Sequence, residues 1–438
     1  MKKRTYLRFI STLAMLASMI SIALGAASTP VQAAGLPYNS HPIKVNPVIS
    51  KTSQSQNAQY QFACQAPAAP FHCYGPQQIR AAYSIQPLLD KGITGKERTI
   101  VIIDAYQSPT VQQDLNTFST TFGLPSTMIK VIAPDGLTPF DYNDGTQISW
   151  AEEISLDVQW AHAVAPGATI DLVLAKSSQD ADILSVTQYA VEHNLGDVIS
   201  QSFGEAESCA DPRLLATEHQ VFEEATSKHI TLFAASGDSG AAQSTCDGTS
   251  FLLSASTPAS DPLVTGVGGT HLNADVTTGK YISEVGWSDS GGGYSTIYKR
   301  PFYQNEAVKS KWRGVPDVSY DANNGGVLTA LGFLGAYSGI YSISGTSMGS
   351  PQWAGIIALA DQKVYHRLGF INPTLYAIGH NPFAYHSAFH DIVSGNNTIV
   401  IFDINGNPLT IPGYNATGGW DAITGWGSPI VSKLVYLL

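Results

Sequence analysis

Ser347 is the first residue whose surroundings suggest chemistry. It stands in the stretch SGTSMGSP, residues 344–351, where a strand-like run meets a helix-like one, and Gly345 and Gly349 lie on either side of it. A serine hydroxyl is a weak nucleophile until a neighbouring base takes its proton. The chain must therefore supply a base, and three arrangements could provide one.

The first arrangement is the nucleophile elbow of α/β-hydrolases, because residues 345–349 fit the pattern G-x-S-x-G. An elbow needs an acidic residue and then a histidine further along the chain. Two aspartates and two histidines follow Ser347, but none of them stands in a recognisable catalytic motif: Asp361, Asp391, His386 and His390. A motif this short matches by chance often, so we regard this interpretation as the weaker one.

The second arrangement is subtilisin-like. GTSMGSP resembles the GTSMAxP string that carries the subtilisin serine, with Pro351 in the first turn of the following helix, where a missing N–H costs little. Asp104 ends the apolar run TIVIID, where a subtilisin would have its Asp. Subtilisins also need a His inside an HGT string, and none of the eleven histidines is followed by Gly-Thr. The imidazole base of that chemistry is missing.

The third arrangement replaces the imidazole with carboxyl groups. Glu153 and Asp157 lie four residues apart in a stretch of helical periodicity that Pro166 and Gly167 end, so both side chains project from one face of the predicted helix. On its own, such an acidic pair is more often a solvated helix face, and this alternative stays open here.

Asp238 favours the carboxyl arrangement. It stands in FAASGDSGA, residues 233–241, in a loop where subtilisin-like folds carry an Asn that donates a hydrogen bond to the oxyanion. An ionised Asp would repel an oxyanion, whereas a protonated Asp can donate to it. The site therefore requires Asp238 to be neutral during turnover, through burial or an acidic medium.

The elements that must position these groups follow from the apolar runs. Runs of strand length occupy residues 99–104, 169–175, 198–203, 230–235 and 263–269, and stretches of helical periodicity occupy residues 150–164, 180–194 and 212–228. This alternation predicts an α/β fold with a mostly parallel sheet flanked by helices on both faces. In such sheets the functional groups gather beyond the carboxyl ends of the strands.

Taken together and in order, these strings resemble the sedolisin family, the serine-carboxyl peptidases that share the subtilisin fold and work in acid. The resemblance covers about residues 76–438 and includes EISLDVQWAHAVAPGA, ASGDSGA, VTGVGGT and SGTSMGSPQWAG. It implies one catalytic domain with Ser347 as nucleophile, Glu153 as base, Asp157 as the group that orients Glu153, and Asp238 as oxyanion donor. Because neighbouring carboxyl groups do not all ionise readily, we expect Glu153 and Asp157 to share a proton.

The resemblance also implies one structural calcium ion near the C-terminus. The strings HDIVSG and ATGGWDAITGWGSP match the family pattern and suggest carboxylates from Asp391 and Asp421 with the backbone carbonyls of Ile392, Thr417 and Gly419. Ligands made only of oxygen suit this hard cation. Thr417 stands where the family usually has Gly. The alternative is a glycine-rich turn with two surface aspartates.

The N-terminal region is expected to be processed. Basic residues at positions 2–8 precede an apolar run and then small residues, which indicates a signal peptide over residues 1–33 and a secreted, extracellular protein with no membrane attachment after cleavage. An uncleaved anchor is the alternative. Residues 34–75 read as a short leader, too short for the folded prodomain that sedolisins usually carry. Residues 76–438 then form the catalytic domain.

The composition of the chain limits which classes of molecule it is expected to bind. The net charge is −11 and only 13% of residues are charged, which argues against nucleic acid. We expect a monomer that acts on proteins or peptides. The four cysteines allow three pairings or free thiols, and we expect pairing between sequence neighbours: Cys64 with Cys73, and Cys209 with Cys246.

The sequence thus predicts an exported acid endopeptidase that forms an acyl-enzyme on Ser347. A tripeptidyl-type aminopeptidase of the same fold is one alternative. A secreted peptide-binding protein that has lost turnover is another, although the four residues that the family uses for catalysis are all present.

Overall fold

The structure, a computed structural model, describes residues 38–45, 47–56, 61–66, 68–323, 325–402 and 406–438. The predicted signal peptide, residues 1–33, and the first residues of the leader, 34–37, lie outside the described residues.

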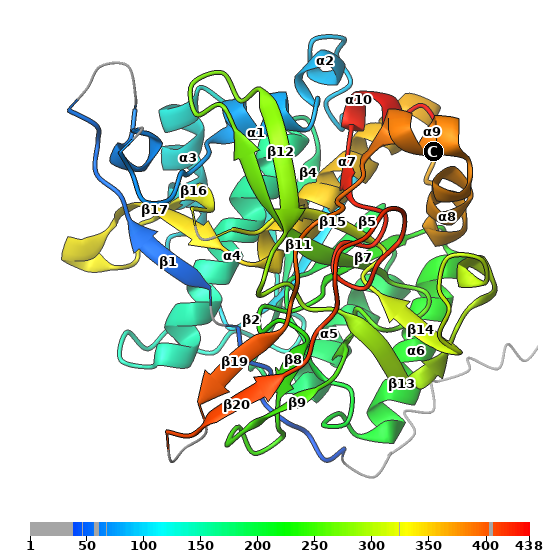
Figure 1. The fold of residues 1–438 in the computed structure, drawn as a ribbon. Coiled ribbons are helices and arrows are strands. Elements are labelled where there is room, and N and C mark those ends of the chain that lie inside the picture. Colours follow the sequence, from blue (N-terminus) through cyan, green and yellow to red (C-terminus); the bar gives the residue numbers. More distant parts are fainter. Residues whose placement is uncertain (1–37, 46, 57–60, 67, 324, 403–405) are drawn as a thin grey trace, which may run out of the picture. The chain divides into compact units, whose positions relative to one another are not determined.

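An eight-stranded sheet forms the centre of the fold, in the order β12-β11-β7-β5-β2-β4-β3 with β15 beside β11 (Figure 1). All neighbours in it are parallel except β12, which is antiparallel to β11. The five predicted strands are all present in it, which confirms the mostly parallel sheet. The strands are β2 Thr99–Ala105, β3 Ile129–Ile132, β4 Thr169–Ala175, β5 Val198–Gln201, β7 Thr231–Ala235, β11 Thr265–Ala274, β12 Tyr281–Gly286 and β15 Val318–Asp321.

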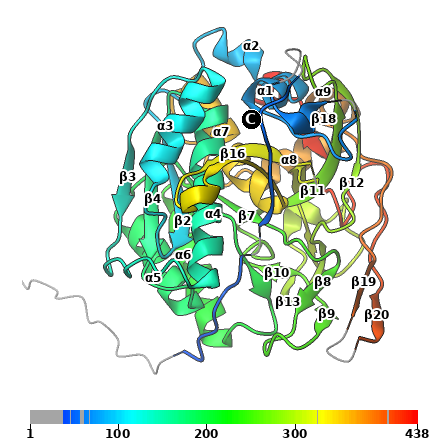
Figure 2. The same ribbon diagram turned by 90° about the vertical axis from the view of Figure 1, so that its left-hand side faces the viewer.

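Helices cover both faces of this sheet (Figures 1 and 2). In β2, Ile100 and Ile102 pack into one apolar core, whereas Val101 and Ile103 pack into the other, because successive side chains of a strand point to opposite faces. The first core contains α3 Val111–Phe122, α4 Gly145–Val164 and α7 Gly349–Val364. The second contains α5 Asp180–Glu192 and α6 Pro212–Ser227. The helices predicted at 150–164, 180–194 and 212–228 correspond to α4, α5 and α6.

Side-chain caps fix where two of these helices begin. The Asp144 carboxylate accepts a hydrogen bond from the backbone N–H of Thr146 at 2.9 Å, and Asp211 accepts one from Arg213 at 2.8 Å. These bonds satisfy N–H groups that have no partner inside the helix. The cap at Asp144 starts α4 five residues earlier than the sequence pattern predicted.

The remaining elements surround this centre. The shorter helices are α1 Pro76–Ala82, α2 Gln86–Leu89, α8 Asn372–His380, α9 Pro382–Ala388 and α10 Val431–Leu434. The small sheets pair β6 Glu205–Ala206 with β10 Ser256–Thr257, β8 Ala242–Ser244 with β9 Phe251–Leu253, β13 Gly293–Lys299 with β14 Trp312–Val315, β18 Phe389–His390 with β21 Ser428–Pro429, and β19 Ile399–Phe402 with β20 Pro408–Ile411.

The described part of the leader is integrated into the fold. Its residues Val48–Lys51 form β1, which pairs antiparallel with β17, Gly339–Ser344; β17 in turn pairs with β16, Val327–Leu331 (Figure 1). The leader belongs to the same compact unit as the rest of the chain from Tyr38 to Leu438. A strand edge leaves N–H and C=O groups unpaired, and β1 supplies partners for those of β17. The sequence pattern did not show this strand.

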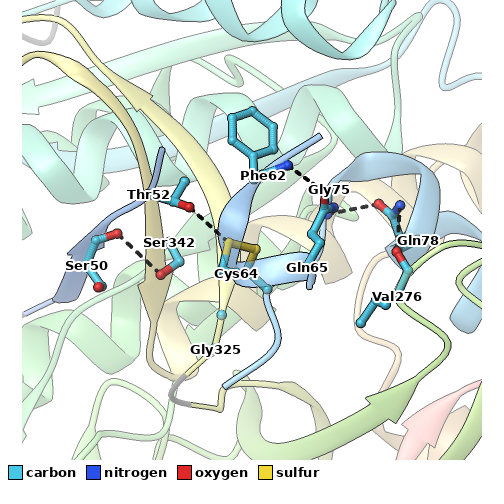
Figure 3. The surroundings of a disulfide bond; sticks show 12 residues. Ser50, Thr52, Phe62, Cys64, Gln65, Gly75, Gln78, Val276, Gly325 and Ser342 are labelled. Carbon is cyan, nitrogen blue, oxygen red and sulfur yellow. Dashed lines mark hydrogen bonds between the residues drawn. A yellow bond between two sulfur atoms is a disulfide. The ribbon is translucent and has the colours of Figure 1, made fainter. Parts of the chain in front are cut away.

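Both disulfides join the cysteines that the sequence predicted. Cys64 pairs with Cys73, and Cys209 pairs with Cys246. Figure 3 shows the first bond beside the leader strand, where the Thr52 hydroxyl donates to Cys64 Sγ at 3.2 Å. Both cysteines belong to the leader, so this bond closes a loop within it, just before α1.

A glycine allows α7 to pack closely against α4 in the first core. At Gly355 in α7, a Cβ atom would lie 2.8 Å from Cβ of Val164 in α4, so the helices pack closely only because this residue has no side chain.

We therefore expect Gly355→Ala to lower the free energy of unfolding by about 1–3 kcal/mol, since the added methyl group must push the helices apart. The same substitution at Gly145, where nothing lies within 4 Å of the added Cβ, is the control. Urea unfolding of both variants measures the difference. Equal stability of the two would contradict the close helix contact.

Candidate active site

Ser347 lies at the junction between β17 and α7, within a short 3-10 turn, Thr346–Met348. Gly345 precedes the turn with φ +135°, and a Cβ atom there would lie 2.6 Å from Oδ2 of Asp238. A glycine is therefore required for both its backbone angle and its space. The Ser347 side chain is buried at the bottom of a pocket, and its hydroxyl donates to the carbonyl of Ser202 at 3.3 Å.

Glu153 and Asp157 are buried on α4, with 1% and 0% of their surface exposed. Almost the whole of α4 is buried between the sheet, α7, α3 and β16, so the pair is not a solvated helix face. Glu153 lies close enough to the Ser347 hydroxyl for that hydroxyl to lower its pKa, and Asp157 interacts in the same way with Glu153 and Ser202. The serine and both carboxyl groups thus meet in one place.

Burial dominates the electrostatics of this pair. Desolvation raises the pKa of Glu153 well above its ordinary value, and the charge of Asp157 raises it further. Desolvation also raises the pKa of Asp157, followed by the charge of Asp104. The two carboxyl groups interact strongly, so they titrate as a pair and hold a proton between them in acid.

Asp238 stands across the pocket from this pair, in the loop after β7. Its Oδ1 accepts hydrogen bonds from the backbone N–H and the hydroxyl of Thr346, both at 2.7 Å. Desolvation raises the pKa of Asp238, and the bonds from Thr346 oppose this shift. The residue as a whole is exposed toward the pocket, so solvent moderates the shift and its direction is what matters. Because Oδ1 is occupied, a protonated Asp238 would donate from Oδ2.

Two further carboxyl groups belong to this cluster, and sequence reasoning missed both. Asp104 in β2, which the sequence matched only to the aspartate of the subtilisin arrangement, is fully buried. Neither of its oxygens has a hydrogen-bond partner within the described structure, and its charge raises the pKa of Asp157. Glu152 is buried beside Glu153, and burial raises its pKa to about 7. The position of Asp104 at the carboxyl end of a parallel strand was the signal that could have found it.

The pocket above Ser347 has a volume of about 370 Å³. Glu153, Asp238 and Ser347 line it. The segments 202–206 and 243–248 line it as well, with a few further residues of the body. The leader contributes His41, Pro42, Lys44, Val45, Pro47 and Val48. We call the leader segment of residues 38–45 and 47–51 the strap. It runs along the pocket before β1 joins β17 next to Ser344.

The residues predicted to hold calcium also lie together. Asp391 accepts hydrogen bonds from Gly419 N–H at 3.0 Å and from the Tyr385 hydroxyl. Asp421 accepts them from the N–H groups of Thr417, Ile423 and Thr424 and from the Thr424 hydroxyl. Within the described residues, no hydrogen bond reaches the carbonyl oxygens of Ile392, Thr417 and Gly419. No group of three or more His, Cys, Asp or Glu side chains that could hold a metal occurs in the part of the chain described. Two carboxylates with free carbonyls form an oxygen-only donor set that fits calcium.

A subtilisin-like sheet that carries a serine against buried carboxyl groups, with Asp238 in the loop after β7, is the arrangement expected of a serine-carboxyl peptidase. Residues 143–381 match the family model described as the subtilase family. Kumamolisin of Bacillus sp. (strain MN-32) is 30% identical over 403 residues, which are 87% of this chain and 67% of kumamolisin. The solved structure of Pseudomonas sedolisin, a serine-carboxyl proteinase, has a TM-score of 0.68 at 30% identity and covers 83% of this chain and 97% of that one.

The chain belongs to the sedolisin family of serine peptidases. A third relative, Tripeptidyl-peptidase 1 of Mus musculus, is 29% identical over 310 residues, which are 65% of this chain and 51% of that protein. The chain therefore spans between half and two thirds of the length of these curated relatives.

The buried carboxyl groups make a prediction about stability. Burial raises the pKa of Glu152 to about 7 and those of Glu205 and Asp321 to about 8, and it raises those of Glu153 and Asp157 as well. These groups hold protons more tightly in the folded protein than in the unfolded chain, where the pKa is about 4. We therefore expect the melting temperature to fall as the pH rises from about 4 to 8.

Two histidines, the buried His162 and the half-buried His390, act in the opposite direction below about pH 6.5, because desolvation lowers their pKa. They are fewer than the carboxyl groups. Thermal melts across this range test the balance, with Glu152→Gln as a partner variant whose melting temperature should fall less between pH 6 and 8. A melting temperature at pH 8 that equals or exceeds the one at pH 4 would refute the prediction.

Proposed function

We propose that this protein is an acid-acting serine-carboxyl endopeptidase that hydrolyses peptide bonds through an acyl-enzyme on Ser347. The observation that carries the proposal is the meeting of the Ser347 hydroxyl with the buried pair Glu153 and Asp157, opposite Asp238. Family membership supports it, and so does a pocket that opens onto the serine.

Each group has a role that its surroundings favour. Glu153 takes the hydroxyl proton as Ser347 Oγ attacks the peptide carbonyl, and it then delivers that proton to the departing amine. Asp157 keeps the Glu153 carboxyl in place and holds the shared proton. Asp238, protonated at Oδ2, donates to the oxyanion that forms on the carbonyl oxygen. Water then repeats the attack and releases the acyl group. In the structure Ser347 donates to Ser202 instead, and a substrate would realign it toward Glu153.

The proposed cleavage mode is internal, with removal of N-terminal tripeptides as the second candidate. The second mode is favoured by the relative named as a tripeptidyl-peptidase and by the strap, which narrows the pocket. Mass spectrometry of a digested protein separates the two modes, because tripeptides released in series from one end differ from a set of internal fragments.

We also propose that the protein is exported and acts as a monomer outside the cell. The basic and apolar N-terminus supports a signal peptide over residues 1–33, and two disulfides suit an oxidising compartment. No helix within the described residues is long and apolar enough to cross a membrane. Sequencing the N-terminus of exported protein tests both this cleavage and a later one near residue 76, which would remove the leader.

A single calcium ion is proposed at the C-terminal loop, bound by Asp391, Asp421 and the carbonyls of Ile392, Thr417 and Gly419. The free carbonyls and the convergence of both carboxylates on the loop of residues 417–421 support this site. When bound, the ion would hold together segments that are far apart in the sequence.

Activity on peptides should follow a bell-shaped pH profile centred well below neutrality. Asp238 must keep its proton, which sets the limit at higher pH, and Glu153 must accept one, which sets the limit at lower pH. Initial rates on a peptide library between pH 2 and 8 measure the profile. A maximum at pH 7 to 8 would contradict the mechanism.

Ser347→Ala should lower kcat by roughly a thousandfold or more, since no nucleophile remains. Ser387→Ala, which changes an exposed hydroxyl on α9, is the control and should keep full activity. If Ser347→Ala hydrolyses peptides as fast as the parent protein, Ser347 is not the nucleophile. If neither protein hydrolyses any peptide, the alternative of a silent peptide-binding protein is favoured.

Calcium removal should lower the melting temperature by several degrees, because a ligand that binds only the folded state stabilises it. Asp391→Asn should melt at the lower temperature with or without chelator. Asp135→Asn, a change at an exposed aspartate that contacts Ser185, should respond to chelator like the parent protein. A parent melting temperature unaffected by excess chelator would remove the site.

A further inference from the structure

The acidic and the basic groups that line the pocket come from different parts of the chain. The body of the protein contributes only acidic ones, namely Glu153, Glu205, Asp238 and Asp247. Both basic residues that line the pocket, His41 and Lys44, belong to the strap. The strap therefore places positive charge against a wall that is otherwise acidic.

Asp247 is the acidic group of this wall that stays charged in acid. Burial raises the pKa of Glu205 to about 8, so Glu205 is neutral where the enzyme is proposed to work. Hydrogen bonds from Thr245 and Thr249 instead lower the pKa of Asp247 to about 2. Asp247 thus keeps a negative charge in the pocket when its neighbours have lost theirs.

The loop that carries Asp247 is held in shape. Oδ1 of Asp247 accepts from the Thr245 hydroxyl at 2.6 Å, from Thr249 N–H at 3.1 Å and from the Thr249 hydroxyl at 2.9 Å. The adjacent Cys246 is bonded to Cys209, which also lines the pocket. These contacts occupy Oδ1, and no hydrogen bond within the described structure occupies Oδ2, which leaves this oxygen available to a ligand.

Lys44 of the strap already points at this loop. Backbone bonds hold the strap, with Ile43 N–H donating to Ser178 at 2.8 Å and Asp180 N–H donating to His41 at 2.9 Å. Ile43 and Val45 are buried in the second core, so Lys44 between them faces the other way, as alternation in an extended chain requires. Its Nζ lies 3.4 Å from the position that a Cβ of Gly248 would take. An ammonium group thus rests beside the Asp247 loop.

We propose that Asp247 determines specificity by binding a positively charged nitrogen of the substrate, and that the Lys44 ammonium of the strap, which lies beside the neighbouring Gly248, competes with the substrate for this carboxylate. The inference rests on the proposed peptidase function and concerns the same pocket. The nitrogen can come from a Lys or Arg side chain or from the free amino end of a peptide, and both carry the same charge in acid.

The effect should be moderate, because Asp247 is exposed and water screens an exposed ion pair. We expect selectivity of about two- to fivefold between a charged and a neutral group. It should weaken as the salt concentration rises.

Binding to the Ser347→Ala variant tests this without requiring turnover. Fluorescent peptides that differ only by Lys or Gln at each position, each with a free or an acetylated amino end, are titrated at pH 4 by anisotropy. We expect the charged peptides to bind about two- to fivefold more tightly, and Asp247→Asn to abolish the difference while leaving the neutral peptides unchanged. If the gain in affinity follows the Lys residue, the bound nitrogen belongs to a side chain; if it follows the free amino end, the bound nitrogen is the peptide's N-terminus.

Asp275→Asn is the matched control. Asp275 is also an exposed turn aspartate that accepts hydrogen bonds from neighbouring threonines, and it does not line the pocket. It should preserve the preference for charge. Lys44→Gln should raise the affinity for charged peptides more than for neutral ones, because the competing ammonium is gone.

Equal binding of charged and neutral peptides, or a preference that survives Asp247→Asn, would overturn the inference while leaving the peptidase proposal intact. Conversely, a charge preference that depends on Asp247 in a protein whose parent form hydrolyses nothing would uphold the binding role and reject the peptidase function. The two failures are therefore distinguishable.

Discussion

Keeping several carboxyl groups out of water beside one hydroxyl is the constraint on which the rest of this structure depends. An isolated buried charge is costly, and the protein meets that cost by holding the groups protonated or in shared pairs. The burial of α4 between the sheet and α7 achieves this for Glu153 and Asp157. The same burial leaves Asp104 without a hydrogen-bond partner, which is tolerable only while that carboxyl group is neutral.

The backbone around the site is adapted to this crowding. Because Gly345 has no side chain, Asp238 can approach the turn that carries Ser347. Because Gly355 has none, α7 can lie close against α4. Both glycines are positions where atoms from distant parts of the chain come within van der Waals contact. The serine and its carboxyl partners come from separate elements, so their meeting depends on close packing rather than on a local motif.

The leader adds a second layer to the pocket. Its strap lines part of the pocket and, among the residues that the structure describes, supplies the pocket's basic side chains, while β1 completes the edge of the strand that ends near the nucleophile. The proposed charge selectivity rests on this arrangement, because the Lys44 ammonium and a positively charged group of the substrate would compete for the same acidic wall. While the leader remains attached, the pocket is therefore lined by both the leader and the catalytic body.

The sequence by itself determined the sheet and helix pattern and the family, since apolar periodicity and ordered motifs are local signals. It favoured pairing between neighbouring cysteines, and the structure decided among the possible pairings. The sequence also placed Glu153 and Asp157 on one helix face, because the helical repeat fixes that geometry. Only the tertiary structure shows whether that face is solvent-exposed or buried, because this depends on the packing of α4 into the first core. Likewise the approach of Asp104 to Asp157, the pairing of β1 with β17, and the position of Lys44 beside Gly248 join residues far apart in the chain. No local pattern specifies such contacts, because they depend on how whole elements pack in three dimensions.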